Sequence, residues 1–337
     1  MLDDFTTSDS VAAAPKRHRA RRIIVSLVAI ILVLSIGTVA GYLAFLNHTV
    51  TTNVKHEALL PTPTAGEKVP VKVPAAKDAQ NILMIGSDSR GSVGNGRSDV
   101  IVLMHVSDDR KKVHLVHFPR DLYVDVPGHG KDKINAAYAY GGPQLLVRTL
   151  QNLVDVPIDH VAVIGFDGFK AMTDAMGGVD VYAEESSTTP GNGTVHVGVN
   201  HLDGAAALAF VRERHQLSEG DISRGRRQQA FIKALMLKSL SRETITNPVR
   251  LAQFVDAGTK NLTVDEAFSV ADMRSQAVSM RDLRSKDIVF IAAPITGFGT
   301  SPQGASIDIV DEAKMAQLSI GLKSDDLSNI SLDQQIP

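Results

Sequence analysis

The sequence has no cysteine and no tryptophan, and its charges nearly cancel, with 35 Lys and Arg against 37 Asp and Glu. The absence of cysteine excludes disulfide scaffolds, thiol nucleophiles, iron–sulfur clusters and cysteine-ligated zinc sites. A net charge of −2 argues against a protein that works mainly by charge attraction to nucleic acid. The 14 prolines and 26 glycines are ordinary numbers for 337 residues, which excludes a collagen-like or low-complexity chain.

Charge is also absent from one long segment near the N-terminus. Residues 23–46 form an uncharged apolar run that is long enough to cross a bilayer core of roughly 30 Å as a helix. The apolar core of a signal peptide is shorter, about 7–15 residues, so we expect an uncleaved anchor. The basic residues directly before the run are Lys16, Arg17, Arg19, Arg21 and Arg22. By the positive-inside rule, this cluster predicts a single-pass type II plasma-membrane protein with everything after the run on the outer side.

Composition divides the rest of the chain. Residues 1–22 are predicted to be a basic cytoplasmic tail, 23–46 the transmembrane helix, and 47–79 an extracytoplasmic stalk. The stalk contains four prolines and no helical period, which favours extended backbone, although an edge strand around residues 68–73 is an alternative. Residues 80–322 are predicted to form the folded domain, and 323–337 a C-terminal tail.

Apolar strands interleaved with helical patterns indicate the fold class. Strands are predicted at 81–86, 99–106, 112–118, 160–166, 179–182 and 287–293. Helices are predicted at 144–154, 168–176, 203–211, 222–240, 248–260 and 265–283. This alternation predicts an α/β sheet covered by helices on both faces.

Common catalytic motifs are missing from these elements. The nearest match to a phosphate-binding P-loop, GSDSRG at 86–91, is followed by Ser92 and Val93 instead of Lys and Ser or Thr. His105, His114 and His117 lie on predicted strands. Because His114 and His117 are three residues apart, they point to opposite faces, and we expect ordinary sheet histidines instead of metal ligands.

Arginine and aspartate residues gather where strands end and helices begin. Such positions suit anions, because ligands bind beside strand ends and helix N-termini carry positive dipole ends. Several arginines with two aspartates fit a pyrophosphate or phosphodiester bound with a divalent metal. A Gly-rich loop between Asp88 and Asp99 can bring both carboxylates to one Mg²⁺. The set comprises Asp88 and Arg90 (GSDSR), Arg97 and Asp99 (RSD), Arg120 and Asp121 (PRD), Arg212 and Arg214 (FVRERH), and Asp221, Arg224, Arg227 and Gln228 (GDISRGRRQQ).

Most arginines on α/β domains are solvated or make weak surface ion pairs, so a single arginine in this set is weak evidence of a site. The combination is more specific than its members. Arg148 and Arg226 are expected to face solvent.

The chain resembles the LytR–CpsA–Psr family of cell-wall glycopolymer ligases. The motifs that carry the resemblance are NILMIGSDSR, GRSDVIVLMHV, HFPRDLYVDVPGHGKDKINAAYAYGGPQLL, HLDGAAALAFVRERH and GDISRGRRQQAFIKAL. They are dense between residues 81 and 240 and thinner to about 322. The resemblance implies a three-layer α-β-α sandwich with a twisted central mixed sheet, and an apolar pocket for a polyprenyl chain.

The resemblance also implies an activity. The protein would be a phosphotransferase that moves a glycopolymer from a polyprenyl-pyrophosphate carrier onto peptidoglycan through a phosphodiester link, with Mg²⁺ (or Mn²⁺) as cofactor. Asp88 and Asp99 would be the metal-side carboxylates. Arg120, Arg212, Arg214 and Asp121 would be the catalytic residues. The pyrophosphate-binding set would be Arg90, Arg97, Arg120, Arg212, Arg214, Arg224, Arg227 and Gln228.

Several points stay open at this level. Asp121 and Asp221 match family positions, and we expect them to orient arginines or cap a helix. The general base is unassigned between Asp88 and Asp121. Gly225 and Arg226 depart from the family pattern and are expected to loosen the start of their helix and add positive charge. A polyprenyl-pyrophosphate phosphatase and a non-catalytic glycolipid-binding protein are alternatives. A transcription regulator is excluded, because the predicted cytoplasmic tail is too short for a helix-turn-helix domain.

Overall fold

An apolar helix begins the described part of the chain, which in this computed structural model comprises residues 17–63, 69–87, 96, 98–328 and 330. The chain divides into two units, Met1–His48 and Thr49–Pro337. Helix α1 (Arg17–Asn53) supplies the first unit and extends into the second. Its segment Val25–Asn53 is the one stretch among the described residues that is long and apolar enough to cross a membrane. The predicted N-terminal apolar helix is therefore confirmed as a candidate membrane span.

The second unit contains the remaining strands and helices. Its strands are β1 (Lys55–Glu57), β2 (Gln80–Ser87), β3 (Ser98–Val106), β4 (Val113–His117), β5 (Leu122–Val126), β6 (Gly130–Lys133), β7 (His160–Gly165), β8 (Val179–Ala183), β9 (Ser187–Thr189), β10 (Gly193–Val195), β11 (Gly198–Leu202), β12 (Leu262–Asp265), β13 (Ile288–Ala292), β14 (Ile295–Thr300) and β15 (Ser306–Val310). Its helices are α2 (Ile134–Val154), α3 (Phe166–Ala175), α4 (Gly204–Arg212), α5 (Asp221–Ser239), α6 (Arg242–Thr246), α7 (Pro248–Lys260), α8 (Val270–Ser279) and α9 (Glu312–Ser324), with short 3₁₀ turns η1 (Pro74–Ala76) and η2 (Ser285–Asp287).

Seven strands form the central sheet in the order β1-β12-β7-β2-β3-β4-β13. The pairs β1–β12, β7–β2 and β4–β13 are parallel, whereas β12–β7, β2–β3 and β3–β4 are antiparallel. The sheet is therefore mixed, as predicted. Strand β3 reads as a nearly continuous apolar run because both faces of the sheet are covered.

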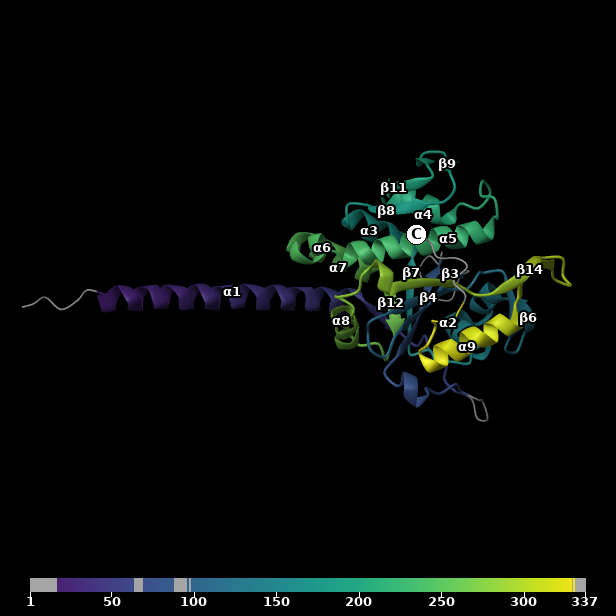
Figure 1. Cartoon of the computed structure of the whole chain (residues 1–337), viewed down its shortest axis with the longest axis horizontal. Helices are drawn as coiled ribbons and strands as arrows, with labels where there is room; N and C mark the ends of the chain where they lie inside the picture. Colours follow the sequence, from purple (N-terminus) through teal and green to yellow (C-terminus); the bar gives the residue numbers. More distant parts are fainter. Residues whose placement is uncertain (1–16, 64–68, 88–95, 97, 329, 331–337) are drawn as a thin grey trace, which may run out of the picture. The chain divides into compact units, whose positions relative to one another are not determined.

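Alternate residues along each strand belong to two separate apolar layers, because successive side chains point to opposite faces of the sheet. On one face, Leu83, Leu103 and Val116 belong to a core that includes residues of α2 and α9. On the other face, Val102 and Leu115 pack with residues of α5. Figure 1 shows α4 and α5 on one side of β3 and β4, with α2 and α9 on the other. The three-layer α-β-α sandwich is confirmed.

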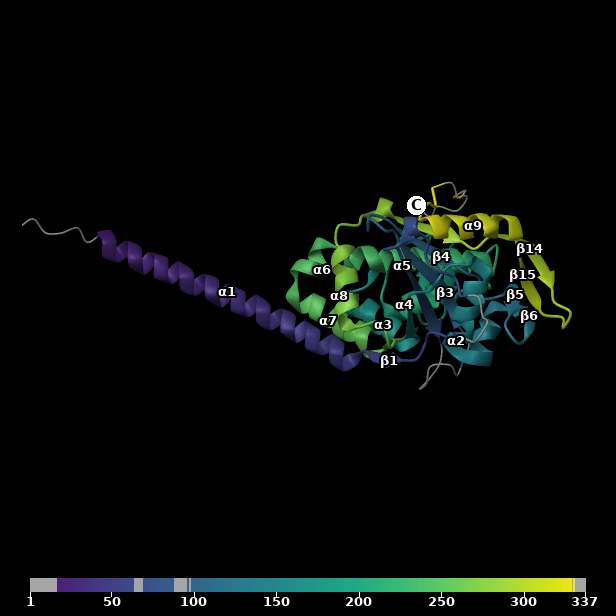
Figure 2. The same cartoon turned by 90° about the horizontal axis from the view of Figure 1, so that it is seen from below.

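A smaller sheet extends the domain beside α2. Its order is β14-β15-β5-β6, with β5 and β6 joined as an antiparallel hairpin. Figure 2 shows these strands together at one end of the domain. Because β5 begins directly after Arg120 and Asp121, this sheet fixes the backbone that follows the end of β4.

Two element boundaries differ from the sequence predictions. Helix α2 begins at Ile134, ten residues before the predicted start, and contains non-helical backbone at Gly141 and Gly142. Pro143 indicated a helix start at 144, but it follows a kink between two helical segments. The predicted helix at 265–283 is shorter, Val270–Ser279, because Asp265 still belongs to β12 and Ser269 caps the helix N-terminus.

The predicted extended stalk also differs from the structure. Helix α1 continues to Asn53, whose side-chain amide donates to Asp256 Oδ1 (3.0 Å) and Thr259 Oγ1 (3.1 Å) on α7. Lys55–Glu57 then pairs in parallel with β12. No strand occurs in the described part of the alternative segment, residues 69–73. The partner strand lies about 200 residues along the chain, so no local signal could have predicted the pairing.

Candidate active site at one edge of the central sheet

The strand order brings several predicted site residues to one edge of the sheet. Ser87 at the end of β2 pairs with Ser98 at the start of β3 and with Gly165 at the end of β7. His117 ends β4 at the same edge, where it pairs with Val102 of β3. Because β3 is antiparallel to both neighbours, Asp99 near its start lies beside the last residues of β2 and beyond the end of β4, on the side of the residues that follow His117.

Arg120 is the centre of a charged cluster at this edge. Its Nη1 lies 3.0 Å from Asp99 Oδ1, and its Nε lies 3.5 Å from Asp121 Oδ2. Lys133, at the end of β6, places its Nζ 2.8 Å from Asp121 Oδ1. These side chains are 17–25% exposed, so the cluster is held by the fold and still reaches solvent. Asp121 thus lies between Arg120 and Lys133, and Lys133 is a member of the cluster that the sequence reasoning missed.

Gln228 does not share this cluster. Its Nε2 donates to the Val211 carbonyl of α4 (3.3 Å), so its Oε1 faces His117 Nε2 at 3.1 Å. His117 is therefore the donor, and its proton lies on Nε2. This buried bridge ties β4 to α5 and to the residue before Arg212.

His117 was expected to be an ordinary sheet histidine, but it stands at the edge that carries the charged cluster. Burial lowers the pKa of His117 to about 4, and the charge of Arg224 acts in the same direction, so the ring is neutral at neutral pH. Gly225 of α5 packs against the ring: a Cβ there would lie 3.0 Å from His117 Cε1. The glycine therefore does not loosen the helix, which is continuous from Asp221 to Ser239, but lets it approach β4 closely. In the sequence, the signal that could have placed His117 at this edge is its position three residues before Arg120.

The remaining predicted arginines have different surroundings. Arg212 is exposed and lies over the ring of Phe166, 4.8 Å from its centroid, after the end of β7. Arg227 is buried, donates to Ser187 Oγ (2.8 Å) and the Glu185 carbonyl (2.7 Å), and stacks on Phe210. Arg224 is also buried.

Arg214 is half-buried, and its Nε lies 3.4 Å from His215 Nε2. Arg120 and Arg212 thus have solvent access, whereas Arg227 stabilises the packing of α5 on β9.

The expectation that Arg226 faces solvent is wrong. Its guanidinium lies 2.8 Å from Glu184 and 3.8 Å from Glu185, and it also pairs with Glu219. Only 19% of the side chain is exposed. The sequence could not predict this because Glu184 and Glu185 are about 40 residues away. Arg148 keeps partial exposure and donates to the Thr62 carbonyl.

Four predicted residues cannot be placed here. Asp88, Arg90 and Arg97 lie outside the described residues. Asp221 begins α5, but its side chain is also outside them.

An apolar cavity of about 310 Å³ opens beside the cluster. Its lining comes from the ends of β4 and β13 and from α5 and α9, and it includes Phe290, Ile291 and Leu318. His117, Gln229 and Lys314 add polar groups, and Pro119 connects the lining directly to Arg120. Cavities of this size, mostly apolar with a few polar groups, are typical of ligand sites.

A magnesium ion at this edge would need oxygen donors from the described side chains. No group of three or more His, Asp or Glu side chains suited to a metal occurs among the described residues. Mg²⁺ is usually held by one or two carboxylates, with substrate phosphates and water completing its shell. Asp99 supplies one such carboxylate beside Arg120, and the buried hydroxyl of Ser98 has no hydrogen-bond partner in the part of the chain described. Among the described residues at this edge, Asp99 is therefore a carboxylate that would contribute to holding such an ion.

Comparisons with known proteins identify the relatives of this chain. A model of the LytR_cpsA_psr family matches residues 41–324. The probable cell wall biosynthesis protein LcpB of Corynebacterium glutamicum is 37% identical over 248 residues, covering 69% of this chain and 58% of LcpB. The polyisoprenyl-teichoic acid–peptidoglycan teichoic acid transferase TagU of Bacillus licheniformis is 30% identical over 314 residues, covering 92% and 98%.

The fold is similar to that of solved structures. A structure of TagT bound to LI-WTA superposes with a TM-score of 0.62 at 28% identity, covering 78% of this chain and 98% of TagT. The chain spans little more than half of the two Corynebacterium glutamicum relatives, 58% of LcpB and 54% of LcpA.

Proposed function

The chain belongs to the LytR–CpsA–Psr family, and we propose that it is a glycopolymer–peptidoglycan phosphotransferase. It would take a glycopolymer from a polyprenyl-pyrophosphate carrier and attach it to a sugar hydroxyl of peptidoglycan. The names of its relatives support this class of reaction, since TagU is a teichoic acid transferase acting on peptidoglycan. The observation that carries the proposal is a partly exposed Arg120 held between two carboxylates, directly after Pro119, which lines an apolar cavity.

The reaction balances without an oxidant or reductant. The acceptor hydroxyl oxygen forms a bond to phosphorus, the bond from phosphorus to the oxygen of polyprenyl phosphate breaks, and the hydroxyl proton is released. Negative charge on the leaving phosphate grows as this bond breaks, so cationic groups lower the barrier. Arg120 and Arg212, which reach solvent, would supply that charge. Arg214 and Arg224 are the further members of the proposed binding set, whereas Arg227 is held by Ser187 and the Glu185 carbonyl.

The carboxylates have positioning roles in this proposal. Asp121 is held by Arg120 and Lys133, which favours orientation of the guanidinium over proton abstraction. Asp99, together with Asp88, would hold Mg²⁺ or Mn²⁺. The ion would offset phosphate charge when bound. Gln228 would act through His117 by fixing α5 against β4.

The substrates and location follow from the same proposal. The cavity would receive the part of the polyprenyl chain next to the pyrophosphate. The basic residues before α1 favour a cytoplasmic N-terminus, so the domain would lie on the outer side of the plasma membrane as a type II protein. There it meets peptidoglycan.

A transfer assay tests the proposal. Full-length protein in detergent micelles is given labelled polyprenyl-pyrophosphate-linked glycan and Mg²⁺, with and without peptidoglycan. Label is expected on peptidoglycan, and no soluble glycan is expected without it. Release of glycan without acceptor would indicate a phosphatase. Donor binding without any turnover would indicate a glycolipid-binding protein.

A further inference from the structure

The carboxylate of Asp121 is shared by two cations. Lys133 Nζ lies 2.8 Å from Asp121 Oδ1, and Asp121 Oδ2 lies 3.5 Å from Arg120 Nε. The side chains of Lys133 and Asp121 are 24% and 17% exposed. Because both groups are partly buried, salt in the solvent screens their attraction less than it would screen an exposed pair.

The fold fixes Lys133 in this position. Lys133 is the last residue of β6 and pairs with Tyr123 of β5, which follows Asp121 by two residues. In the first turn of α2, the backbone N–H of Asn135 donates to the Arg120 carbonyl at 3.2 Å. Strand pairing and a backbone hydrogen bond therefore hold Lys133 beside Arg120 and Asp121.

A second lysine on the same strand lacks this environment. Lys131 lies two residues before Lys133 and points to the same face of β6, because side chains alternate along a strand. Lys131 is exposed and pairs in register with Asp125, but its ammonium makes no ion pair with a described residue. The contact with Asp121 is therefore specific to Lys133.

The charges around Asp121 explain what a lysine can do there. Asp121 lies against the guanidinium of Arg120, but its negative charge also offsets the positive charge that Arg120 presents to a phosphate. The attraction between the site and a phosphate depends on the sum of the nearby charges. Arg120, Asp121 and Lys133 together carry one positive charge, whereas Arg120 and Asp121 alone would carry none. Asp99 contributes equally to both sums.

We propose that Lys133 is a positioning residue for the transfer reaction. It neutralises Asp121, so that Asp121 orients Arg120 without cancelling the charge of Arg120 at the pyrophosphate. This role rests on the proposed transferase function, which assigns Arg120 to the pyrophosphate. Lys133 acts through Asp121 and does not itself contact the substrate.

A double-mutant cycle on the full-length protein tests this role. Lys133→Ala is expected to lower kcat for transfer about tenfold, and Lys133→Arg to keep it near the wild-type value. In an Asp121→Asn background, Lys133→Ala should change kcat less than about twofold, because no carboxylate charge remains to be neutralised. Lys131→Ala is the matched control. Lys133→Met, which keeps most of the aliphatic stem, replaces Lys133→Ala if urea unfolding shows that the alanine variant does not fold.

The cycle separates this role from two others. A lysine that binds a phosphate directly, or one that only supports the hairpin, should cost the same activity with or without the Asp121 charge. An equal loss of kcat in both backgrounds would therefore overturn the proposal. An unchanged kcat in Lys133→Ala would overturn it as well.

A binding measurement gives a readout without turnover. Calorimetric titration with inorganic pyrophosphate is expected to show about fivefold weaker binding by Lys133→Ala than by the wild type. The double variant Lys133→Ala/Asp121→Asn should bind at least as tightly as the wild type. Weaker binding by the double variant would contradict the role of Lys133. A wild-type protein that neither transfers glycan nor binds pyrophosphate would contradict the proposed function instead.

Discussion

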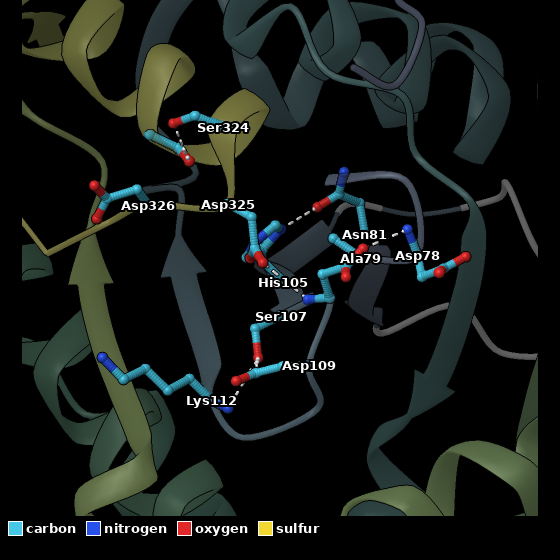
Figure 3. A network of polar contacts seen from close by, with 12 residues as sticks. Asp78, Ala79, Asn81, His105, Ser107, Asp109, Lys112, Ser324, Asp325 and Asp326 are labelled. Atoms are coloured by element: carbon cyan, nitrogen blue, oxygen red, sulfur yellow. Dashed lines mark hydrogen bonds and ion pairs between the residues drawn. The ribbon is translucent and has the colours of Figure 1, made fainter. Parts of the chain in front are cut away.

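The two edges of the central sheet both carry charged side chains, but they use them differently. At the edge opposite the charged cluster, His105 is fully buried, with Nδ1 2.8 Å from Asn81 Oδ1 and Nε2 2.9 Å from Asp325 Oδ1 (Figure 3). The Asn81 amide donates to the Pro157 carbonyl, so its oxygen faces the ring. Both ring nitrogens of His105 therefore lie against side-chain oxygens.

This opposite edge is closed. The second oxygen of Asp325 accepts the Asp108 backbone N–H at 2.9 Å, so both ring nitrogens of His105 and both oxygens of Asp325 have partners. At the charged cluster, Arg120 and Asp99 keep about a fifth to a quarter of their surface exposed. The comparison indicates that a closed polar network stabilises the fold, whereas a held but open one can bind a charged ligand.

The largest expected effect comes from opening the closed edge. Asp325→Ala leaves His105 Nε2 and the Asp108 backbone N–H without their partners. Because each unsatisfied buried group costs about 1–3 kcal/mol, we expect a total loss of about 3–5 kcal/mol in the free energy of unfolding. Urea unfolding of the full-length protein measures this, with Asp326→Ala as the exposed neighbouring control. An equal loss in both variants would contradict the role of the His105–Asp325 pair.

Removing the partly exposed guanidinium of Arg120 should change the transfer activity and leave the stability nearly unchanged. Arg120→Ala is expected to lower the transfer rate by about 10²–10³-fold, because a fixed cation near the developing phosphate charge is lost. Its unfolding midpoint should stay near that of the wild type. Arg281→Ala, at a side chain that is 65% exposed, is the control. A folded Arg120→Ala variant that transfers glycan at the wild-type rate would contradict the proposed role of Arg120.

Acid should weaken β4 through its buried histidines. The pKa of His117 falls to about 4 in the folded state from 6.5, so the unfolded state binds a proton first as pH drops. The stability that the neutral ring contributes is fully present above pH 6.5 and is lost between pH 6.5 and about 4. The expected loss is about 2 kcal/mol between pH 6.5 and 5. Burial lowers the pKa of His114 to about 4 as well, so it adds a loss of the same sign.

Thermal unfolding between pH 7 and 5 measures this loss. His117→Gln is expected to be less stable at pH 7 but to depend less on pH. His196→Gln, at an exposed position, is the control. For Asp325 the pKa is lowered, since the bonds from His105 and Asp108 outweigh burial, so its contribution is present above about pH 3.8 and lost only below it. If the stability of His117→Gln falls with pH as steeply as that of the wild type, His117 is not a source of the acid-induced loss.

The smallest effect concerns the metal. Asp99→Asn keeps an oxygen that can accept from Arg120 but removes a charge from the expected Mg²⁺ site. We expect the Mg²⁺ concentration for half-maximal transfer to rise about tenfold. Titration of transfer against Mg²⁺ measures this, with Asp125→Asn, at an exposed position of β5, as the control. An unchanged titration would count against Asp99 as a ligand.

Local signals predicted much of the fold. The helix at Pro248–Lys260 matches its predicted bounds, because proline begins it and its period is regular. The strands β4, β7 and β13 were also predicted within a residue or two at each end. The hairpin strands β5, β6, β14 and β15 were not predicted, since their pairing, and not their composition, makes them strands.

The site was predicted in part for the same reason. Asp99, Arg120 and Asp121 stand at strand ends, and their contacts with one another follow from strand order. Gln228 and Arg227 share a helix with Arg224. Helical spacing does not reveal that Gln228 hydrogen-bonds with His117 and that Arg227 donates to Ser187.

By itself, the sequence determined the apolar span, the order of strands and helices and the charged motifs at their ends, because these depend on neighbours within a few residues. Only the tertiary structure decided which charged side chains keep access to solvent. Arg226 meets Glu184, and His117 meets Gly225, through packing between segments far apart in the chain. Whether a charged side chain is closed or open depends on partners that the fold brings to it, and those partners lie beyond the reach of any local pattern.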